Sequence, residues 1–284
     1  MNDTHAFQRF SACTNDSYFQ RGRHETKIAR TSFYSGSLIF NFQQQTENGS
    51  TLYFGVMKLE DNYRHKGLRK KLLENLQQMG ISDQRVLDAI NAVPRHYFLS
   101  SAFLEIAYEN RAFQIGEGQT ISHPFTVATQ SVLLDTQPGM KVLEIGTGSG
   151  FQAAVLCQLG VKVYSIERHQ PLHLAAKTLF QHMHQIDRKF NPTLVYGDGY
   201  KGLPAFAPFD RIIITCAVPD VPEKLLMQLK PGGKLVMPFG KGAVQQMMVI
   251  QELEDGTFHH ELHGSFSFVP MLEERKSVAA KKMS

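Results

Sequence analysis

Short apolar runs alternate with longer amphipathic segments from Lys141 onward, and this alternation constrains the possible folds more than any other feature. Runs with strand character lie at 141–145, 162–167, 193–198, 209–218 and 232–240. Segments with helical character lie between them, at 150–160, 170–186 and 221–230. Such alternation builds a mostly parallel sheet that is covered by helices on both faces. The sequence therefore predicts a doubly wound α/β fold, with the runs 246–253 and 268–272 as late strands at one edge.

Two helices are expected before the sheet begins. Apolar residues recur at helical spacing within 68–79, and Gly80 ends this helix. Ser82 is the expected N-cap of a second helix, with Asp83 in its first turn, and Pro94 stops that helix.

Residues 1–56 differ in character from the rest of the chain. They are rich in polar residues and Phe and show no sustained period, and the one candidate strand, Gly36–Phe42, has no obvious neighbour. A segment that buries so little apolar surface does not offset its ordering entropy of about 1–2 kcal/mol per residue. We therefore expect a disordered or non-native extension with Met57 as the initiator in the cell, then a main domain at 57–272 and a polar tail at 273–284. A lid or partner-docking arm is the alternative interpretation of residues 1–56.

Composition narrows the classes of protein further. The 284 residues carry a formal net charge of +4 and a pI near 8.9 without a dense Lys/Arg tract, so nucleic acid is not an expected partner. Cys13, Cys157 and Cys216 are too few and too scattered for a disulfide framework or a zinc site. The first residues lack a secretory signal pattern, and no apolar run approaches the ~18–20 residues that span a membrane. We therefore expect a cytoplasmic protein without a membrane partner.

Three glycines occupy alternate positions in the first strand–helix turn of the sheet, at Gly146, Gly148 and Gly150. Ligands of such folds bind at the carboxyl ends of the strands, near the point where the strand order reverses. Glycine permits positive φ there and lets a ligand approach the backbone closely. A dinucleotide-binding turn would read G-x-G-x-x-G, whereas this turn reads G-x-G-x-G, which disfavours a nicotinamide-dependent oxidoreductase.

Acidic residues lie beside the ends of three strands. Glu144 precedes the first glycine by two residues, Glu167 ends the next strand, and Asp198 follows the third strand. We expect Glu144 to help hold the cationic end of a cofactor, directly or through water. Glu167 suits a ribose diol, and Asp198 suits an adenine amino group. Together with the glycine turn, these acids favour a site for S-adenosylmethionine.

Several longer motifs follow one another between Leu68 and Leu272. They read "VPRHYF", "AYENRAF", "GEGQTISHPF", "LEIGTGSGFQAAVL", "GDGY", "APFDRIIITCAVPDVPEKLLMQLKPGGKLVMPFG" and "FVPML". Many methyltransferases share the glycine turn, but "GQTIS" before it is more specific. On these motifs the chain resembles the protein-L-isoaspartate O-methyltransferase family.

This resemblance implies a Rossmann-like, S-adenosylmethionine-dependent methyltransferase that acts on damaged proteins and peptides. The family methylates the free α-carboxylate of L-isoaspartyl residues, and the ester then closes to a succinimide whose hydrolysis returns some normal aspartate. The resemblance also implies a catalytic position at Ser122. The expected cofactor-binding residues are Thr120, Ile121, Glu144, Gly146, Gly148, Gly150, Glu167 and Asp198.

The chemistry of the reaction suggests what Ser122 does. A carboxylate has an ordinary pKa of about 4, so it is ionised at neutral pH and needs no general base. A serine hydroxyl that donates to one carboxylate oxygen leaves the other free to attack, so we expect a positioning donor rather than a nucleophile. A turn or N-cap serine is the alternative, which "S-H-P" also permits.

The remaining candidates receive simpler interpretations. Leu272 stands where members of the family often carry a threonine, so a hydroxyl contact near the cleft is lost. His123 also stands in the cleft segment, but we interpret it as a helix-start histidine without a chemical role. Four histidines are interpreted as solvated surface because no Cys or carboxylate set completes a metal site: His169, His173, His182 and His184.

Two rival functions stay open from the sequence. A methyltransferase of the same fold that acts on a small molecule or RNA would share the glycine turn and the acids, but it would not need "GQTIS". A binding protein that has lost turnover would keep the fold, although Ser122 and the three acids are all present. The oligomeric state is also open, and we take a monomer as the working expectation.

Overall fold

A computed structural model describes residues 31–34, 37–40, 42–45, 51–54, 60–253 and 255–272. The chain divides into two compact units, Met1–Asn62 and Tyr63–Ser284. Of the described helices, none is both long and apolar enough to cross a membrane.

The first unit contains four short strands. β1 (Thr31–Tyr34) pairs antiparallel with β2 (Ser37–Phe40), and β3 (Phe42–Gln45) pairs antiparallel with β4 (Thr51–Phe54). The candidate strand within Gly36–Phe42 therefore does have a neighbour, contrary to the sequence expectation. The predicted disorder of the other residues up to 56, and the polar tail from 273, lie outside the described residues.

The second unit is built on a seven-stranded sheet with the order β13-β12-β11-β10-β7-β8-β9. The strands are β7 (Lys141–Ile145), β8 (Lys162–Glu167), β9 (Thr193–Tyr196), β10 (Phe209–Ile214), β11 (Leu229–Phe239), β12 (Gln245–Glu252) and β13 (Phe258–Phe266). β7 to β11 run parallel, and β12 and β13 continue the sheet antiparallel. The predicted doubly wound, mostly parallel α/β fold is confirmed.

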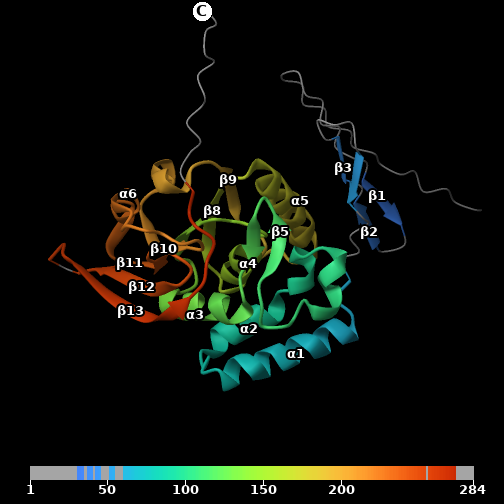
Figure 1. Cartoon of the computed structure of the whole chain (residues 1–284), viewed down its shortest axis with the longest axis horizontal. Coiled ribbons are helices and arrows are strands. Elements are labelled where there is room, and N and C mark those ends of the chain that lie inside the picture. Colours follow the sequence, from blue (N-terminus) through green and yellow to red (C-terminus); the bar gives the residue numbers. More distant parts are fainter. Residues whose placement is uncertain are drawn as a thin grey trace, which may run out of the picture. The chain divides into compact units, whose positions relative to one another are not determined.

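The late strands differ from the prediction. β13 forms the edge beside β12 at the left of Figure 1, and residues 268–272 form no strand. The sequence "FHHELHGSF" of β13 is almost wholly exposed, so it lacks the apolar run that marks the central strands. The amide of Ala217 donates to the Val269 carbonyl and the amide of Met271 to the Ala217 carbonyl, both at 2.8 Å. These bonds hold residues 269–271 against the chain that leaves β10.

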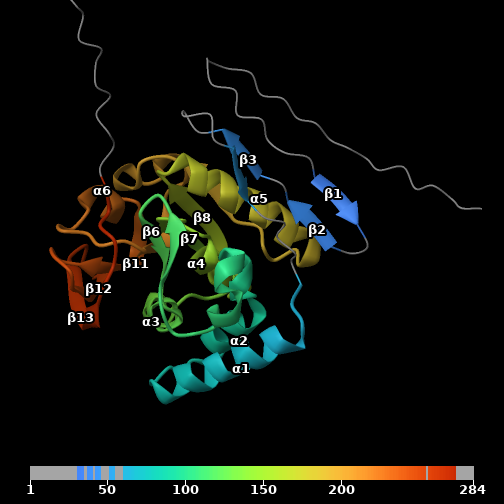
Figure 2. The ribbon, with the colours of Figure 1, turned by 45° about the vertical axis from the view of Figure 1, so that its right-hand side comes forward.

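Six α-helices are described in this unit. They are α1 (Tyr63–Gln78), α2 (Gln84–Ala92), α3 (Pro124–Leu134), α4 (Phe151–Gln158), α5 (Gln170–Ile186) and α6 (Glu223–Leu226). Four 3-10 helices are η1 (Arg95–Phe98), η2 (Ser101–Ile106), η3 (Gly199–Lys201) and η4 (Pro204–Phe206). α1 and α2 lie side by side in both views (Figures 1 and 2), and α2 also contacts α4.

Two helix boundaries correct the sequence analysis. Asp83, not Ser82, caps α2, since its carboxylate accepts hydrogen bonds from the backbone amides of Arg85 and Val86 at 2.9 and 3.4 Å. α6 is only one turn long because the chain after Leu226 turns into β11 at Leu229.

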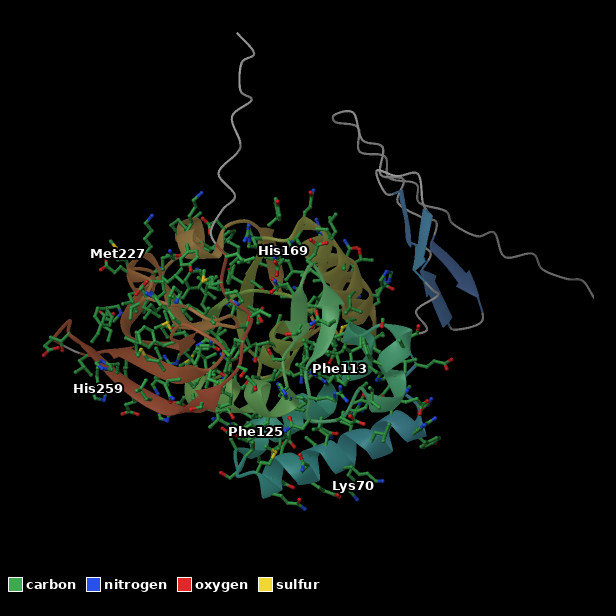
Figure 3. All side chains as sticks on the ribbon, in the orientation of Figure 1. Lys70, Phe113, Phe125, His169, Met227 and His259 are labelled. Carbon is green, nitrogen blue, oxygen red and sulfur yellow. The ribbon has the colours of Figure 1, made fainter. Side chains whose placement is uncertain are left out.

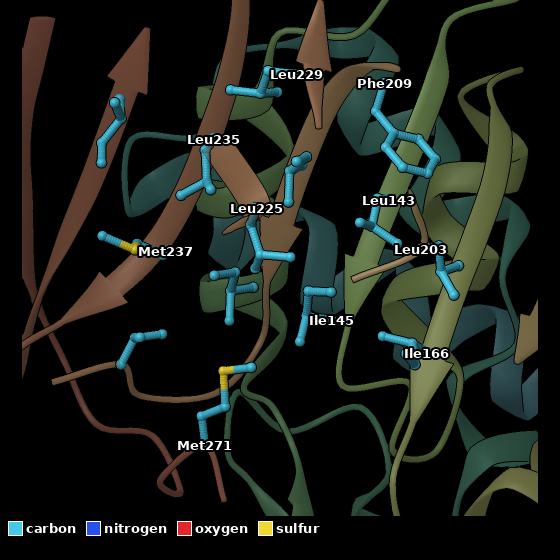
Figure 4. Packing of buried hydrophobic residues seen from close by; sticks show 14 of the residues in the cluster. Leu143, Ile145, Ile166, Leu203, Phe209, Leu225, Leu229, Leu235, Met237 and Met271 are labelled. Carbon is cyan, nitrogen blue, oxygen red and sulfur yellow. The ribbon is translucent and has the colours of Figure 1, made fainter. Parts of the chain in front are cut away.

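One hydrophobic cluster lies on one face of the sheet, where Figure 4 shows side chains of β7, β8 and β11 converging with Leu225 of α6. Leu143 and Leu225 are fully buried and Ile145 is 2% exposed. Burial of each such side chain is worth about 1.5–3 kcal/mol. Because side chains alternate along a strand, Val142 and Glu144 project to the opposite face of β7.

A β-hairpin lies beside the start of α4 in both views (Figures 1 and 2) and consists of β5 (Phe113–Gly116) and β6 (Gln119–Ile121). Glu117 and Gly118 form its two-residue turn with φ values of 52° and 67°. Positive φ at both central residues is the type I′ geometry that matches the twist of paired strands. The hairpin therefore holds Gln119–Ile121 at a fixed place beside the sheet.

Candidate active site

A cavity of about 770 Å³, part of it open to solvent, lies at the carboxyl ends of the central strands. The chain passes outward through β7, β8 and β9 and then returns to β10 on the other side of β7, so the strand order reverses between β7 and β10. Residues that follow both strands line the cavity, together with residues 119–122 of the hairpin and 269–272. This is the position at which ligands bind in open α/β sheets.

The three glycines of the first turn all have positive φ, at 95° for Gly146, 53° for Gly148 and 91° for Gly150. Gly146 and Gly148 line the cavity, whereas Gly150 does not. A Cβ on Gly150 would lie 2.8 Å from the Phe180 ring of α5, so this glycine serves helix packing. A Cβ on Gly146 would lie 2.7 Å from the Thr215 hydroxyl. The turn therefore needs glycine for its backbone and packing, and only its first two glycines border the cavity.

Glu167 lies at the end of β8 with its side chain aimed into the turn, and the residue is 4% exposed. Its Oε2 accepts the amide of Gly148 and its Oε1 accepts the amide of His169, both at 2.8 Å. These bonds fix the carboxylate in one orientation, and Glu167 lines the cavity. Its contact with a ribose diol stays a prediction. A carboxylate oxygen can accept more than one hydrogen bond, so acceptor capacity is left for a ligand.

Glu144 takes a different position from the one expected. It is fully buried and does not line the cavity. The hydroxyl of Ser165, its neighbour on β8, donates to Oε2 of Glu144, and the hydroxyls of Ser165 and Thr147 share a hydrogen bond. Burial raises the pKa of Glu144 from 4.5 to about 8, despite the opposing effect of the Ser165 bond. The expected contact of Glu144 with a cofactor thus finds no support in this placement, because the side chain does not line the cavity.

Asp198 is also absent from the lining, although its neighbour Gly199 is present. Its carboxylate accepts the amide of Tyr200 at 3.0 Å and so caps η3. Its other oxygen lies 3.9 Å from Nζ of Lys201. The adenine contact expected for Asp198 stays a prediction, and the capping role is what the structure shows.

Thr120, Ile121 and Ser122 all line the cavity. Ser122 follows β6 directly and is half-buried. The N-cap of α3 is His123, which makes no capping bond with its side chain, so Ser122 is not an N-cap serine. In the described part of the chain the Ser122 hydroxyl makes no hydrogen bond, whereas its carbonyl is bonded to Arg95. The hydroxyl is therefore available to a ligand, and His123 begins the helix as expected.

Several lining residues were missed by sequence reasoning, among them Gln119, Thr147, His169 and Thr215. His169 precedes α5 (Figure 3), and its Nδ1 lies 3.7 Å from the carboxylate of Glu117 at the hairpin tip. The solvated-surface interpretation is wrong for His169. Among the described residues, the four histidines at or on α5 do not form a set of three metal-ligand atoms. Leu272 lines the cavity, as its family position implied.

Comparisons with known proteins identify the family of this chain. A sequence model described as Protein-L-isoaspartate(D-aspartate) O-methyltransferase matches residues 67–276. The protein-L-isoaspartate O-methyltransferase of Cytophaga hutchinsonii is 49% identical over 214 residues, which cover 75% of this chain and 95% of that protein. This chain belongs to the protein-L-isoaspartate O-methyltransferase family. The member from Flavobacterium johnsoniae is 48% identical over 217 residues, which cover 76% of this chain and all of that protein.

Solved structures agree with the family assignment. A protein-L-isoaspartate O-methyltransferase structure aligns with a TM-score of 0.63 at 31% identity, covering 71% of this chain and 65% of that one. A Plasmodium falciparum β-aspartate methyltransferase, solved in complex with S-adenosyl-L-homocysteine, aligns with a TM-score of 0.62 over 72% of this chain and 99% of that one. At 22% identity the second likeness supports the fold alone.

Proposed function

We propose that this chain transfers a methyl group from S-adenosyl-L-methionine to the free α-carboxylate of L-isoaspartyl residues in damaged proteins and peptides, and so starts their repair through a succinimide. One observation carries the proposal. In a chain of this family, Ser122, Glu167 and the glycine turn border one cavity at the point where the strand order reverses.

The cavity fits a cofactor of this kind. Glu167 offers fixed acceptors for hydroxyl groups, and Gly146 and Gly148 present backbone without a Cβ. When bound, S-adenosylmethionine supplies an electrophilic methyl group on a sulfonium. The residues of this chain then have to hold the substrate carboxylate in line with that methyl group and exclude competing water.

Ser122 is the residue that we assign to the substrate carboxylate. Its hydroxyl makes no hydrogen bond within the described residues, and Ser122 lines the same cavity as the glycine turn. A hydrogen bond from this hydroxyl to one carboxylate oxygen orients the other oxygen for attack, and no proton has to be removed from the nucleophile. Ser122 thus acts as a positioning donor.

The cofactor contacts are assigned to residues that line the cavity with the glycine turn. Glu167 accepts the ribose hydroxyls, Gly146 and Gly148 allow close approach of the ligand, and Thr120 and Ile121 cover it from the hairpin. Gly150 supports this arrangement through its packing against α5. Glu144 acts from beneath the turn through Ser165 and Thr147, and Asp198 acts through the cap of η3, which carries Gly199 into the lining.

The partners follow from the reaction. The substrates are proteins and peptides that contain isoaspartyl residues, and we propose that the chain works as a cytoplasmic monomer without nucleic-acid or membrane partners. The mild net charge of +4 and the scattered cysteines support this part of the proposal.

One assay tests the proposal directly. The full chain is incubated with labelled S-adenosylmethionine and either an isoaspartyl peptide or its normal aspartyl twin. We expect base-labile label on the isoaspartyl peptide alone, because its α-carboxylate lies at a different place along an extended backbone. Equal labelling of both twins, or transfer to RNA alone, would contradict the proposal.

A further inference from the structure

Arg95 of η1 is a buried cation that binds backbone carbonyl groups. The residue is 1% exposed. Its Nε donates to the Ala107 carbonyl at 3.0 Å, and its Nη2 donates to the carbonyls of Arg111 at 3.2 Å and Ser122 at 2.8 Å. The planar guanidinium presents its donors in a fixed fork, so these three bonds define one arrangement of the three segments.

This burial is electrostatically unfavourable. No carboxylate forms an ion pair with Arg95 within the described residues, and burial lowers the pKa of its guanidinium to about 9. An apolar side chain of similar length would avoid the desolvation cost, and such replacements are often neutral or stabilising in other proteins. A role in stability alone is therefore a weak reason for a guanidinium at this position.

The three carbonyls flank the β5–β6 hairpin in the sequence. Ala107 and Arg111 precede β5, and Ser122 follows β6 directly. Arg95 thus joins the chain that enters the hairpin to the chain that leaves it. The bond to the Ser122 carbonyl restrains the peptide plane after Ser122, and the pairing of Ile121 in β6 restrains the chain before it. The two together set the direction of the Ser122 Cα–Cβ bond.

The guanidinium also contacts a second segment that lines the cavity. Its Cζ lies 4.7 Å from the ring centroid of Phe151, the first residue of α4, and Phe151 lines the cavity directly after the glycine turn. A cation over an aromatic face at this distance is attracted by the ring. One buried group therefore touches both the segment that carries Ser122 and the segment that carries the cofactor turn.

We propose that Arg95 is the positioning residue for Ser122, setting the distance and direction of its hydroxyl relative to the glycine turn by binding the Ser122 carbonyl and stacking on Phe151. Arg95 itself lies outside the cavity lining and touches neither substrate nor cofactor. This inference rests on the proposed function, since it assumes that the Ser122 hydroxyl orients the substrate carboxylate.

A double-mutant cycle with Arg95→Met and Ser122→Ala tests this role. Arg95→Met alone should lower kcat for an isoaspartyl peptide by about 10- to 100-fold, as expected for a reacting group displaced by about 1 Å. The affinity for S-adenosyl-L-homocysteine, measured by calorimetry, should fall by a smaller factor than kcat, because Glu167, Gly146 and Gly148 stay in place. In the Ser122→Ala background, Arg95→Met should lower kcat by less than about 3-fold more, since the group that it positions is gone. Losses that multiply across the cycle would overturn the proposal, as would an unchanged kcat in either single variant.

Two further variants separate positioning from charge and from general stability. Arg95→Lys keeps a cation but lacks the fork, so it should stay impaired, and full activity in this variant would contradict the proposal. Arg211→Met is the matched control, because Arg211 also donates to backbone carbonyls, those of Leu134 at 2.8 Å and Asp135 at 3.3 Å, away from the cavity. This control should lower the melting temperature without changing kcat.

Hydrogen exchange gives a readout that does not depend on turnover. In Arg95→Lys and Arg95→Met, the amides of residues 119–123 should exchange faster than in Arg211→Met, whereas those of β7 and β8 should not. Equal exchange of the amides of residues 119–123 in the three variants would overturn the proposed role of Arg95, even if the wild-type chain methylates the peptide. Failure of the wild-type chain to label any isoaspartyl peptide would instead refute the proposed function, and the exchange data would still decide whether Arg95 holds the Ser122 segment.

Discussion

Replacement of Glu144 by Gln should make the stability of this protein less dependent on pH. Glu144 is fully buried in β7, and burial raises its pKa from the ordinary 4.5 to about 8. Between these two values the folded chain keeps a proton that the unfolded chain has released. Stability therefore falls as pH rises through this window, since the folded state binds more protons than the unfolded state.

The magnitude follows from the width of the window. One pH unit within it is worth about 1.36 kcal/mol, so the interval from about pH 5.5 to 7.5 could cost the wild-type fold up to roughly 3 kcal/mol. Glutamine keeps the shape of the side chain and can accept the Ser165 hydroxyl, yet it stays neutral. As pH rises from 5.5 to 7.5, the free energy of unfolding of Glu144→Gln should therefore increase relative to that of the wild type by up to this amount.

Urea unfolding at closely spaced pH values measures this difference, and m-values check that both proteins unfold in the same way. Glu74→Gln on the exposed face of α1 makes the same chemical change at the surface and serves as the control. If the stability curves of Glu144→Gln and the wild type stay parallel from pH 5.5 to 7.5, or if the wild type gains on the variant, Glu144 is ionised in the fold and the reasoning is wrong.

Four further changes have expected outcomes. Ser122→Ala should lower kcat by about 10²-fold or more while calorimetry shows unchanged cofactor binding; a parallel loss of affinity would make Ser122 a cofactor residue. Glu167→Ala should raise the KM for S-adenosylmethionine and affect the peptide KM less, because it removes charge-assisted hydrogen bonds worth roughly 1.5–3 kcal/mol; an unchanged cofactor KM would remove Glu167 from the site. Gly150→Ala should lower the melting temperature, because a Cβ there adds strain at a φ of 91° and meets the Phe180 ring at 2.8 Å; an unchanged melting temperature would contradict that. A chain shortened to begin at Met57 should keep both melting temperature and turnover, and a loss of several degrees or of most activity would show that residues 1–56 contribute.

The central strands were predictable because burial on both faces makes them continuous apolar runs. β7, β8, β10 and β11 therefore fell within or close to the expected ranges. β13 was missed for the opposite reason: it is an edge strand whose side chains are nearly all exposed. Its pairing comes from the backbone of β12, which no side-chain pattern records.

The site was predictable where a motif and a strand end coincide. Glu167 ends its strand and reaches the cavity, whereas Glu144 lies one residue inside its strand and does not line the cavity. Spacing along the chain does not reveal which of two faces a side chain takes. His169 was misread for a related reason, because its contact with Glu117 depends on where the hairpin stands in three dimensions.

The cavity draws residues from segments far apart in the chain, and this has a consequence for the order of events during protein synthesis. The hairpin supplies Gln119–Ser122 early, whereas Val269–Leu272 comes about 150 residues later and is held by its bonds to Ala217. A nascent chain that has formed β7 to β11 still lacks that last wall. Ligand binding is therefore expected to stabilise the finished fold more than the growing one. The rise in melting temperature on adding S-adenosyl-L-homocysteine should therefore be larger for the complete chain than for one that ends before residue 269.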